Sequence, residues 1–147
     1  MDSKKIKFRQ AIDKDSVRIA ELCIQLGYQM NEIDVLEQLQ KIFANEDTSV
    51  IVAEIDNLVT GWIQVSIRSA IESGEIAEIN GLIVDEKFRG NRIGKSLVLK
   101  SEEWAKNKGL KEIRVRTNIT RKETHLFYQG IGFEEKKEQT VFQKKLK

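Results

Sequence analysis

The sequence predicts an α/β fold in which one mixed sheet carries helices on both of its faces. Short apolar segments with strand-like alternation occur along the 147 residues, and longer segments with helical spacing of apolar residues lie between them. The predicted order, β-α-α-β-β-β-α-β-α-β-β, is neither that of a helical bundle nor that of a βαβ repeat. The chain shows no internal repeat and no linker-like stretch, so residues 1–147 are expected to form a single domain.

The expected elements follow one another through short connections. In order, they are a strand over 6–12, a helix from about Ser16 to Gly27, a helix capped by Asn31, strands over 49–55, 58–67 and 75–84, a helix over 92–108, a strand over 111–117, a short helix over 121–129, and a hairpin-like pair over 133–146.

Capping and turn residues set the boundaries of these elements. Residues 13–16 offer capping side chains for the first helix, and Asn31 does the same for the second. Gly27 and Gly109 are natural stops because glycine accepts the left-handed conformation that commonly ends a helix. Residues 56–57, an Asp-Asn pair, tolerate the positive φ of a two-residue hairpin turn.

Composition and charge exclude several classes of function. Lys and Arg number 25 and Asp and Glu number 23, and a net charge of +2 is too balanced for a chain built to coat nucleic acid or an anionic membrane. The single cysteine, Cys23, cannot form an intramolecular disulfide, which fits a cytoplasmic setting. One histidine and one cysteine cannot make a Cys/His zinc site, and no apolar run approaches the length of a membrane span.

The most informative segment is the strand, loop and helix over residues 82–96. An apolar strand leads into a polar loop with Gly90 and Gly94, and the cations Arg89, Arg92 and Lys95 lie around these glycines. A helix N-terminus offers unpaired N–H groups and a positive dipole end, and glycines let backbone approach a phosphate closely. This segment therefore predicts a site for a ligand that carries a pyrophosphate.

Three phosphate-binding patterns compete for this loop. The dinucleotide pattern Gly-x-Gly-x-x-Gly is absent. A P-loop needs four residues before Gly-Lys-Ser, and only three separate Gly90 from Gly94, so a nucleotide-phosphate binder is an alternative with a near-miss motif. The third pattern, Gln/Arg-x-x-Gly-x-Gly/Ala, matches at Arg89 and Gly94 and departs at its middle glycine, which is Arg92 here. That pattern is the pyrophosphate loop of acetyl-CoA-dependent N-acetyltransferases.

A second block completes the resemblance. Residues 118–133 resemble Asn-x-x-x-x-x-Ala-x-x-Phe-Tyr-x-x-x-Gly-Phe, with Thr124 in place of the usual Ala. With both blocks in order, the chain resembles the GNAT superfamily of N-acetyltransferases over nearly its whole length. The strand over 78–84 is similar to strands of the small-amine and aminoalkylphosphonate branch. The resemblance implies a mostly antiparallel sheet with a V-shaped splay.

The resemblance also implies roles in binding acetyl-CoA as cosubstrate. The backbone of the loop should hold the CoA pyrophosphate, the backbone of the strand should pair with the pantetheine arm, and the Asn118 amide should reach the same arm. The implied cofactor-binding residues are Leu82, Ile83, Val84, Arg89, Gly90, Asn91, Arg92, Ile93, Gly94, Lys95, Asn118 and Tyr128.

Two catalytic residues are expected. The resemblance implies that Tyr128 lies near the thioester sulfur and protonates the departing thiolate, a role that a phenol can fill as a general acid. Strand alternation predicts that Glu78, Asn80 and Leu82 share one face, and polar residues in this apolar strand suggest a cleft. Glu78 is the candidate base, acting through a water, and an ion-paired Glu78 is the alternative.

The acceptor amine is expected to meet Tyr28, Glu32, Trp62 and Asn80. The first two lie between the expected first two helices, where the superfamily often builds its acceptor site, and Trp62 occupies a central strand. The predicted function is transfer of an acetyl group to a primary amine of a small molecule by direct attack in a ternary complex. The alternatives are a non-catalytic acyl-CoA-binding module and an enzyme acting on a protein amine. No metal and no nucleic-acid partner are expected, and a homodimer is compatible with the resemblance.

Overall fold

The computed structural model describes residues 5–117 and 120–147. It contains two compact units, one within residues 1–115 and the other within residues 116–147. That they form a single domain stays a prediction. The first unit comprises β1 (Lys7–Gln10), α1 (Ser16–Gln25), α2 (Glu32–Phe43), β2 (Thr48–Ile55), β3 (Leu58–Ala70), β4 (Gly74–Val84), α3 (Ile93–Asn107) and β5 (Ile113–Val115); the second contains α4 (Lys122–Gly130).

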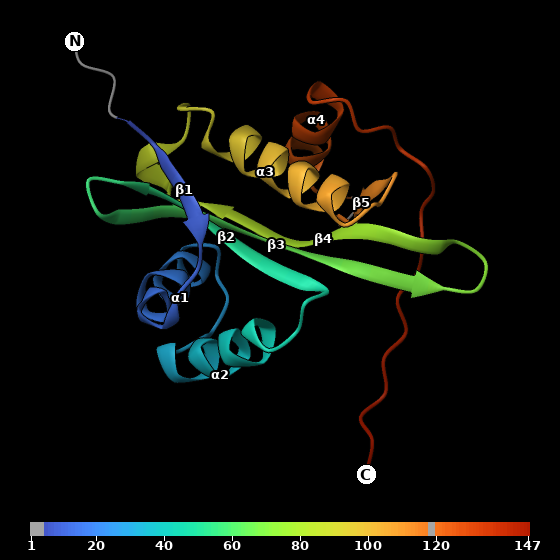
Figure 1. Cartoon of the computed structure of the whole chain (residues 1–147), viewed down its shortest axis with the longest axis horizontal. Helices are drawn as coiled ribbons and strands as arrows, with labels where there is room; N and C mark the ends of the chain where they lie inside the picture. Colours follow the sequence, from blue (N-terminus) through green and yellow to red (C-terminus); the bar gives the residue numbers. More distant parts are fainter. Residues whose placement is uncertain (1–4, 118–119) are drawn as a thin grey trace. The chain divides into compact units, whose positions relative to one another are not determined.

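The first unit is a five-stranded mixed sheet in the order β1-β2-β3-β4-β5. The first four strands pair antiparallel with their neighbours, and β4 pairs with β5 in parallel. Helices α1 and α2 cover one face of the sheet, and α3 covers the other (Figure 1). The predicted fold class, a mixed and mostly antiparallel sheet with helices on both faces, is confirmed.

A hydrophobic core lies on each face of the sheet. On the α1/α2 face, Leu22 and Leu39 pack with Val52 and Ile83, and Trp62 and Met30 lie against this cluster. On the α3 face, Val65 of β3 and Ala77 of β4 pack with Ala105. Burial of these apolar side chains is the main stabilising contribution, and it fixes which side of each strand faces which helix.

The predictions for the Asn31 cap and for the turns of this unit are confirmed. The predicted capping of α1 by residues 13–16 is wrong, because its N-cap residue, Asp15, makes no capping hydrogen bond to α1 and its carboxylate accepts from the Ile12 N–H at 2.8 Å instead. The Asn31 side chain accepts a hydrogen bond from the Asp34 N–H at 2.9 Å and so caps α2. Asp56 and Asn57 take φ values of 49° and 66°, as the two-residue turn between β2 and β3 requires. Gly27, with φ of 89°, follows the end of α1.

The expected hairpin over 133–146 is wrong. Residues 133–147 form neither a helix nor a strand, and Val141, Phe142 and Leu146 are exposed. The segment from Glu134 to Thr140 consists of charged and polar residues and lacks the Gly, Asn or Asp of a tight turn. It also lacks an apolar alternation, so no buried face fixes a register between two strands.

No helix among the described residues is long and apolar enough to cross a membrane.

Gly61 of β3 is the point where α3 approaches the sheet most tightly among the described glycines. A Cβ atom at Gly61 would lie 3.1 Å from the Ile83 carbonyl oxygen, 3.2 Å from Leu97 Cδ1 and 3.3 Å from Ile93 Cγ2. One of these atoms is backbone, which cannot rotate away. The absence of a side chain at Gly61 therefore sets the height of the first turns of α3 above β3 and β4.

We expect Gly61→Ala to lower the free energy of unfolding by about 1–3 kcal/mol, because an added methyl group overpacks this contact. Urea denaturation monitored by tryptophan fluorescence measures the loss. Gly130→Ala, at the end of α4 with no atom within 4 Å of the added Cβ, is the matched control and should leave stability unchanged or raise it. Equal effects of the two substitutions would contradict the role of Gly61.

Candidate active site

The loop between β4 and α3 is fixed at its entry by Asp85. The Asp85 N–H donates to the Thr60 carbonyl oxygen at 2.8 Å, which continues the β3–β4 pairing by one step. The Asp85 carboxylate accepts a hydrogen bond from the Lys87 N–H at 3.1 Å and caps the single 3₁₀ turn over Glu86–Phe88. The chain then passes through residues 89–92 and enters α3 at the buried Ile93.

The beginning of α3 is suited to an anion. Its N-cap residue, Arg92, makes no side-chain capping hydrogen bond. The N–H groups of the first turn, at Ile93, Gly94 and Lys95, have no intrahelical acceptor by helix geometry, and they share the positive end of the helix dipole. The side chains of Arg89, Arg92 and Lys95 are exposed around this turn. Backbone donors and three cations thus meet within one short segment.

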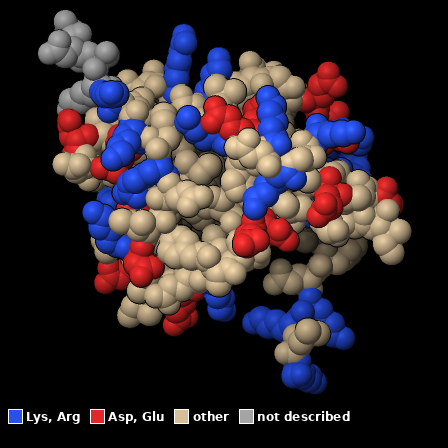
Figure 2. Space-filling model, viewed as in Figure 1, with Lys and Arg blue, Asp and Glu red and all other residues tan. Residues whose placement is uncertain are grey.

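Positive charge in this loop is local. On the face shown in Figure 2, Lys and Arg side chains are interspersed with Asp and Glu side chains. The chain carries a net charge of only +2, so long-range attraction of a polyanion would be weak. The loop therefore suits one compact anionic group better than an extended polyanion.

Arg92 has a left-handed backbone conformation at the position where the sequence pattern has a glycine. Its φ of 61° and ψ of 21° place it in the left-handed region, and Gly90 has φ of 90°. The sequence departs from the pattern at this position, and the left-handed conformation found here is one that glycine adopts at no steric cost. The Asn91 amide donates to the Phe88 carbonyl oxygen at 2.9 Å and helps to hold this turn.

Beyond Ile79, the edge of β4 on the β5 side has no paired strand among the residues that the structure describes. Among the described residues, β5 pairs with β4 only at Ala77, Glu78 and Ile79, while β4 continues to Val84. The backbone of residues 80–84 on that edge can therefore pair with an extended ligand. The predicted cofactor-binding residues Leu82, Ile83 and Val84 lie on this segment. The Ile83 side chain is buried against α1 and α2, so only its backbone is available.

The prediction that Glu78, Asn80 and Leu82 share one face is wrong. Gln64 pairs with Gly81 and Val65 with Ile79, so Asn80 is an extra residue in β4 without a partner in β3. This β-bulge reverses the alternation. Glu78, opposite Ser66, lies on the α1/α2 face, whereas Leu82, opposite Ile63, lies on the α3 face. Gly81 was the available signal, since a lone glycine in a strand often marks a bulge.

Glu78 and Trp62 lie on the same face of the sheet. The Arg68 Nη1 atom lies 3.6 Å from Glu78 Oε1, so Glu78 takes part in an ion pair, as the alternative interpretation expected. The Trp62 ring lies over Gly81, where an added Cβ would come within 2.9 Å of it. The Trp62 Nε1–H is buried and has no hydrogen-bond acceptor among the described residues. A buried donor of this kind is available to a water or a ligand.

Tyr28 and Glu32 lie at the connection between α1 and α2, and both are exposed. Met30, between them in the sequence, packs against the same core cluster as Trp62. The connection therefore passes next to the core that holds Trp62. Contact of Tyr28, Glu32 and Asn80 with an acceptor stays a prediction.

Tyr128 belongs to α4 in the second unit. It is buried, with its ring edge-to-face against Phe127 at 5.0 Å and Phe133 at 5.3 Å between centroids. Burial raises the pKa of Tyr128 to about 12, so the phenol stays protonated through neutral and mildly basic pH. Asn118 lies outside the described residues, and its predicted contact with the pantetheine arm stays a prediction.

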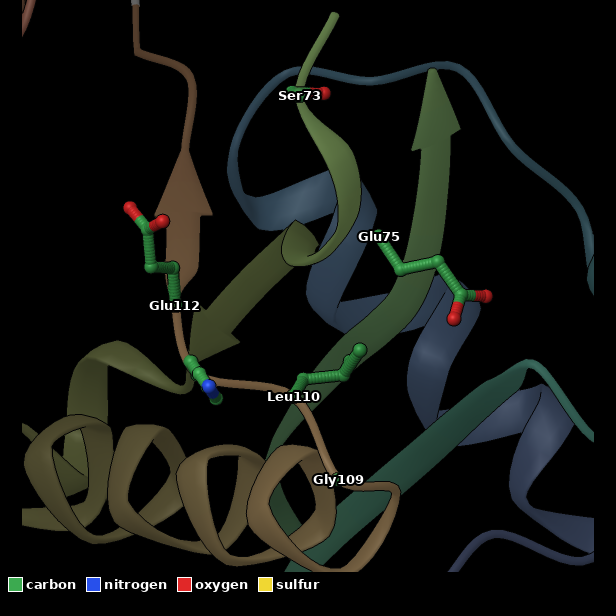
Figure 3. Close-up of a pocket in the computed structure, with 6 residues that line it drawn as sticks. Ser73, Glu75, Gly109, Leu110 and Glu112 are labelled. Atoms are coloured by element: carbon green, nitrogen blue, oxygen red, sulfur yellow. The ribbon is translucent and has the colours of Figure 1, made fainter. Parts of the chain in front are cut away.

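A pocket lies near the start of β4, at the end of the strand opposite the loop, and Figure 3 shows the residues that line it. Its lining consists of Ser73, Glu75, Gly109, Leu110, Lys111 and Glu112. The labelled carboxylates of Glu75 and Glu112 point away from each other in Figure 3, so they do not form a pair. The 11 residues of β4 span about 35 Å at the usual rise per residue, which separates this pocket from the loop. We therefore place the candidate site at the loop and the open edge of β4.

Comparison with known proteins agrees with this geometry. The model of the acetyltransferase (GNAT) family matches residues 17–133. The chain is 26% identical over 132 residues to an aminoglycoside N(6')-acetyltransferase type 1 of Stenotrophomonas maltophilia, and the match covers 86% of this chain and 85% of that enzyme. It is 32% identical over 97 residues to an uncharacterised N-acetyltransferase of Methanocaldococcus jannaschii, which covers 65% of this chain but spans only 43% of the length of that relative.

The structure is similar to that of the aminoglycoside N-acetyltransferase AAC(6')-Iy in complex with CoA. The TM-score is 0.89 at 21% sequence identity, and the match covers 99% of this chain and 98% of that chain. At this identity, the similarity shows the fold. Together with the family match, it leads to a plain conclusion: the chain belongs to the acetyltransferase (GNAT) family, a family of N-acetyltransferases.

The conformation of Arg92 leads to a prediction about stability. A non-glycine residue in the left-handed region raises the free energy of the folded state by about 1–2 kcal/mol. A glycine avoids this cost but loses more conformational entropy on folding, and the free energy of that loss is smaller. We expect Arg92→Gly to keep or raise the free energy of unfolding. The β-branched Arg92→Val should lower it by about 1 kcal/mol or more. Paired urea titrations of the two variants measure the difference, and equal stabilities would show that this backbone conformation carries no strain.

Proposed function

We propose that this chain is an acetyl-CoA-dependent N-acetyltransferase that acetylates a primary amine of a small molecule by direct attack in a ternary complex. The observation that carries the proposal is the segment over residues 89–95, the end of the loop and the first turn of α3, where uncapped helix N–H groups and three cations follow shortly after the open edge of β4. The family match supports it, and the Stenotrophomonas maltophilia relative is an aminoglycoside acetyltransferase.

The residues of the loop and strand fit the chemistry of acetyl-CoA. The pyrophosphate is a compact anion, which the N–H groups of residues 90–95 and the side chains of Arg89, Arg92 and Lys95 would hold. The pantetheine arm carries two amide groups, which suit pairing with the backbone of Leu82 and Val84 along an open strand edge. In this proposal, the Asn118 amide contacts the same arm.

The chemical step joins the amine nitrogen to the acetyl carbonyl carbon and breaks the C–S bond. The attacking amine must be neutral, and Glu78 is proposed to accept its proton through a water molecule. Backbone N–H groups at the β4 bulge, where Asn80 has no partner in β3, are proposed to polarise the acetyl carbonyl. The products are an amide and the CoA thiolate, which then takes up a proton.

Tyr128 is the proposed partner of the thiolate. With a pKa of about 12, its phenol remains a hydrogen-bond donor throughout the pH range of the reaction. An alkyl thiol has a pKa of about 8.5, so complete transfer of a proton from this phenol to the thiolate is uphill. We therefore propose that Tyr128 stabilises the leaving thiolate by a hydrogen bond while the charge develops. The thiolate takes its final proton from Tyr128 only as solvent reprotonates the phenol, so that no free phenolate forms.

The acceptor is proposed to be a small primary amine that contacts Trp62, Asn80 and the connection that contains Tyr28 and Glu32. The Trp62 Nε1–H, which has no hydrogen-bond acceptor within the described part of the chain, suits an amine substrate that carries hydroxyl or ether oxygens. Aminoglycosides, polyamines, amino acids and aminoalkylphosphonates are the classes to compare.

An assay that measures release of the CoA thiol from acetyl-CoA tests this function directly. We expect acetyl-CoA to bind in calorimetry, whereas Mg-ATP does not, because the loop falls short of a P-loop. With acetyl-CoA present, at least one class of primary amine should release CoA well above the rate in buffer. Binding of acetyl-CoA without release by any amine would favour a non-catalytic acyl-CoA-binding module. Release with peptide amines alone would favour a protein substrate.

The role of Glu78 as base has its own test. We expect Glu78→Gln to lower kcat/KM for the amine about 100-fold near pH 6 and progressively less as pH rises. At higher pH more of the amine is already neutral and does not need a base to remove a proton before attack. Rates between pH 6 and pH 10 measure this dependence.

Two variants serve as controls for Glu78→Gln. Arg68→Met removes the same ion pair but leaves the carboxylate, so it should keep the shape of the pH–rate profile. Glu75→Gln makes the same chemical change near the start of β4 and should have little effect. A pH-independent loss in Glu78→Gln that Arg68→Met reproduces would assign Glu78 to the ion pair alone.

A further inference from the structure

Helix α1 holds the entry of the loop through the carboxylate of Asp85. Arg18 Nη2 donates to Asp85 Oδ2 at 2.7 Å, and Gln25 Nε2 donates to Asp85 Oδ1 at 3.3 Å. Asp85 is buried, with 3% of its surface exposed. The residue that begins the loop is therefore bound to a helix that lies 60 residues and more away in the sequence.

Arg18 joins three parts of the first unit through one guanidinium group. Besides its bond to Asp85, its Nε donates to the Val59 carbonyl oxygen of β3 at 2.9 Å. Its Nη1 donates to Glu21, one turn further along α1, at 2.9 Å. The planar group presents its donors in a fixed geometry, so these three bonds orient β3, α1 and the loop relative to one another.

Gln25 adds a second point of attachment. Its amide oxygen accepts a hydrogen bond from the Glu86 N–H at 3.3 Å, while its amide nitrogen binds Asp85. Arg18 and Gln25 are seven residues apart on α1 and lie on the same face of the helix. The first two residues after β4 are thus held by two side chains that lie about two turns apart on α1.

The electrostatics keep this attachment in one charge state. Burial acts to raise the pKa of Asp85, but hydrogen bonds from Arg18, the Lys87 N–H and Gln25 outweigh it and leave the pKa below its usual value. Burial likewise acts to lower the pKa of Arg18, and the bonds to Asp85 and Glu21 leave it raised. Both groups stay ionised at neutral pH, so the contact does not loosen over the range in which an amine acetyltransferase would be assayed.

From these contacts, and resting on the proposed acetyl-CoA site, we propose that Arg18 and Gln25 are positioning residues that hold the loop over residues 85–92 in its cofactor-binding conformation before acetyl-CoA arrives. Neither residue needs to touch the cofactor. They act through Asp85 and the Glu86 N–H. Because the loop is already ordered when the chain folds, acetyl-CoA binding does not include the entropic cost of ordering it, and the affinity for acetyl-CoA is higher.

The chain contains a matched control for this network. Arg9 of β1 binds Asp15 at 2.8 Å and Glu54 of β2 at 2.7 Å, and its side chain is 22% exposed against 21% for Arg18. Both networks join an arginine to a buried aspartate and a second carboxylate. The Arg9 network includes no residue of the loop or of β4. Loss of Arg9 therefore reports the effect of losing a comparable ion pair without disturbing the loop entry.

The experiment compares Arg18→Met, Gln25→Leu and Arg9→Met with the wild-type chain. We expect Arg18→Met to raise the Kd for CoA and the KM for acetyl-CoA about 5- to 20-fold, while kcat and the KM for the amine change less than about twofold. Gln25→Leu, at an exposed position that does not threaten folding, should raise the same two constants about two- to fivefold. Arg9→Met should leave them unchanged even where it lowers the melting temperature as much as Arg18→Met.

Hydrogen–deuterium exchange of the cofactor-free chain gives a second readout. Amides over residues 86–92 should exchange faster in Arg18→Met and Gln25→Leu than in the wild type or in Arg9→Met. Unchanged exchange together with an unchanged Kd for CoA in both α1 variants would overturn the proposal, as would an equal effect of Arg9→Met. If the wild-type chain binds no CoA, the proposed function fails, and the exchange comparison still shows whether α1 orders the loop.

Discussion

The register between β3 and β4 is the constraint on which the candidate site depends. One extra residue, Asn80, shifts the pairing, so residues before and after it point to opposite faces of the sheet. The bulge places Glu78 on the face covered by α1 and α2 and Leu82 on the face covered by α3. A strand without the bulge would direct both side chains to the same side. The separation of the proposed acceptor face from the side chain of Leu82 thus follows from a single inserted residue.

Backbone groups make up much of the proposed cofactor site. The beginning of α3 and the edge of β4 contribute N–H and C=O groups, which every residue except proline supplies in full. What the sequence must specify is the conformation that exposes them: Gly90 and Arg92 with positive φ, Gly61 beneath α3, and Asp85 at the start of the loop. This explains how a chain with one histidine, one cysteine and little net charge can belong to a family of acyl-transfer enzymes.

The sequence was informative where local chemistry decides the structure. The Asn31 cap, the turn at Asp56 and Asn57 and the loop before α3 each depend on residues close together in the chain, and each was predicted. Pairing between distant strands was harder to predict. The bulge at Asn80 depends on how β4 meets β3, and the hairpin expected over 133–146 required a partner strand that its polar sequence does not favour. The contacts of Arg18 and Gln25 with Asp85 carry no local signal, because ordinary helix-surface residues make them.

The burial of Cys23 has a consequence for the chemistry of a reaction that produces a thiol. It is the only cysteine of the chain, it lies on the buried side of α1 in the core, and burial raises the pKa of its thiol. A protonated, buried thiol is a poor nucleophile toward disulfides and thioesters. The folded chain is therefore protected from self-acetylation at this position and from mixed disulfides with oxidised CoA. A thiol-specific reagent added to the reaction would meet only the CoA that turnover releases.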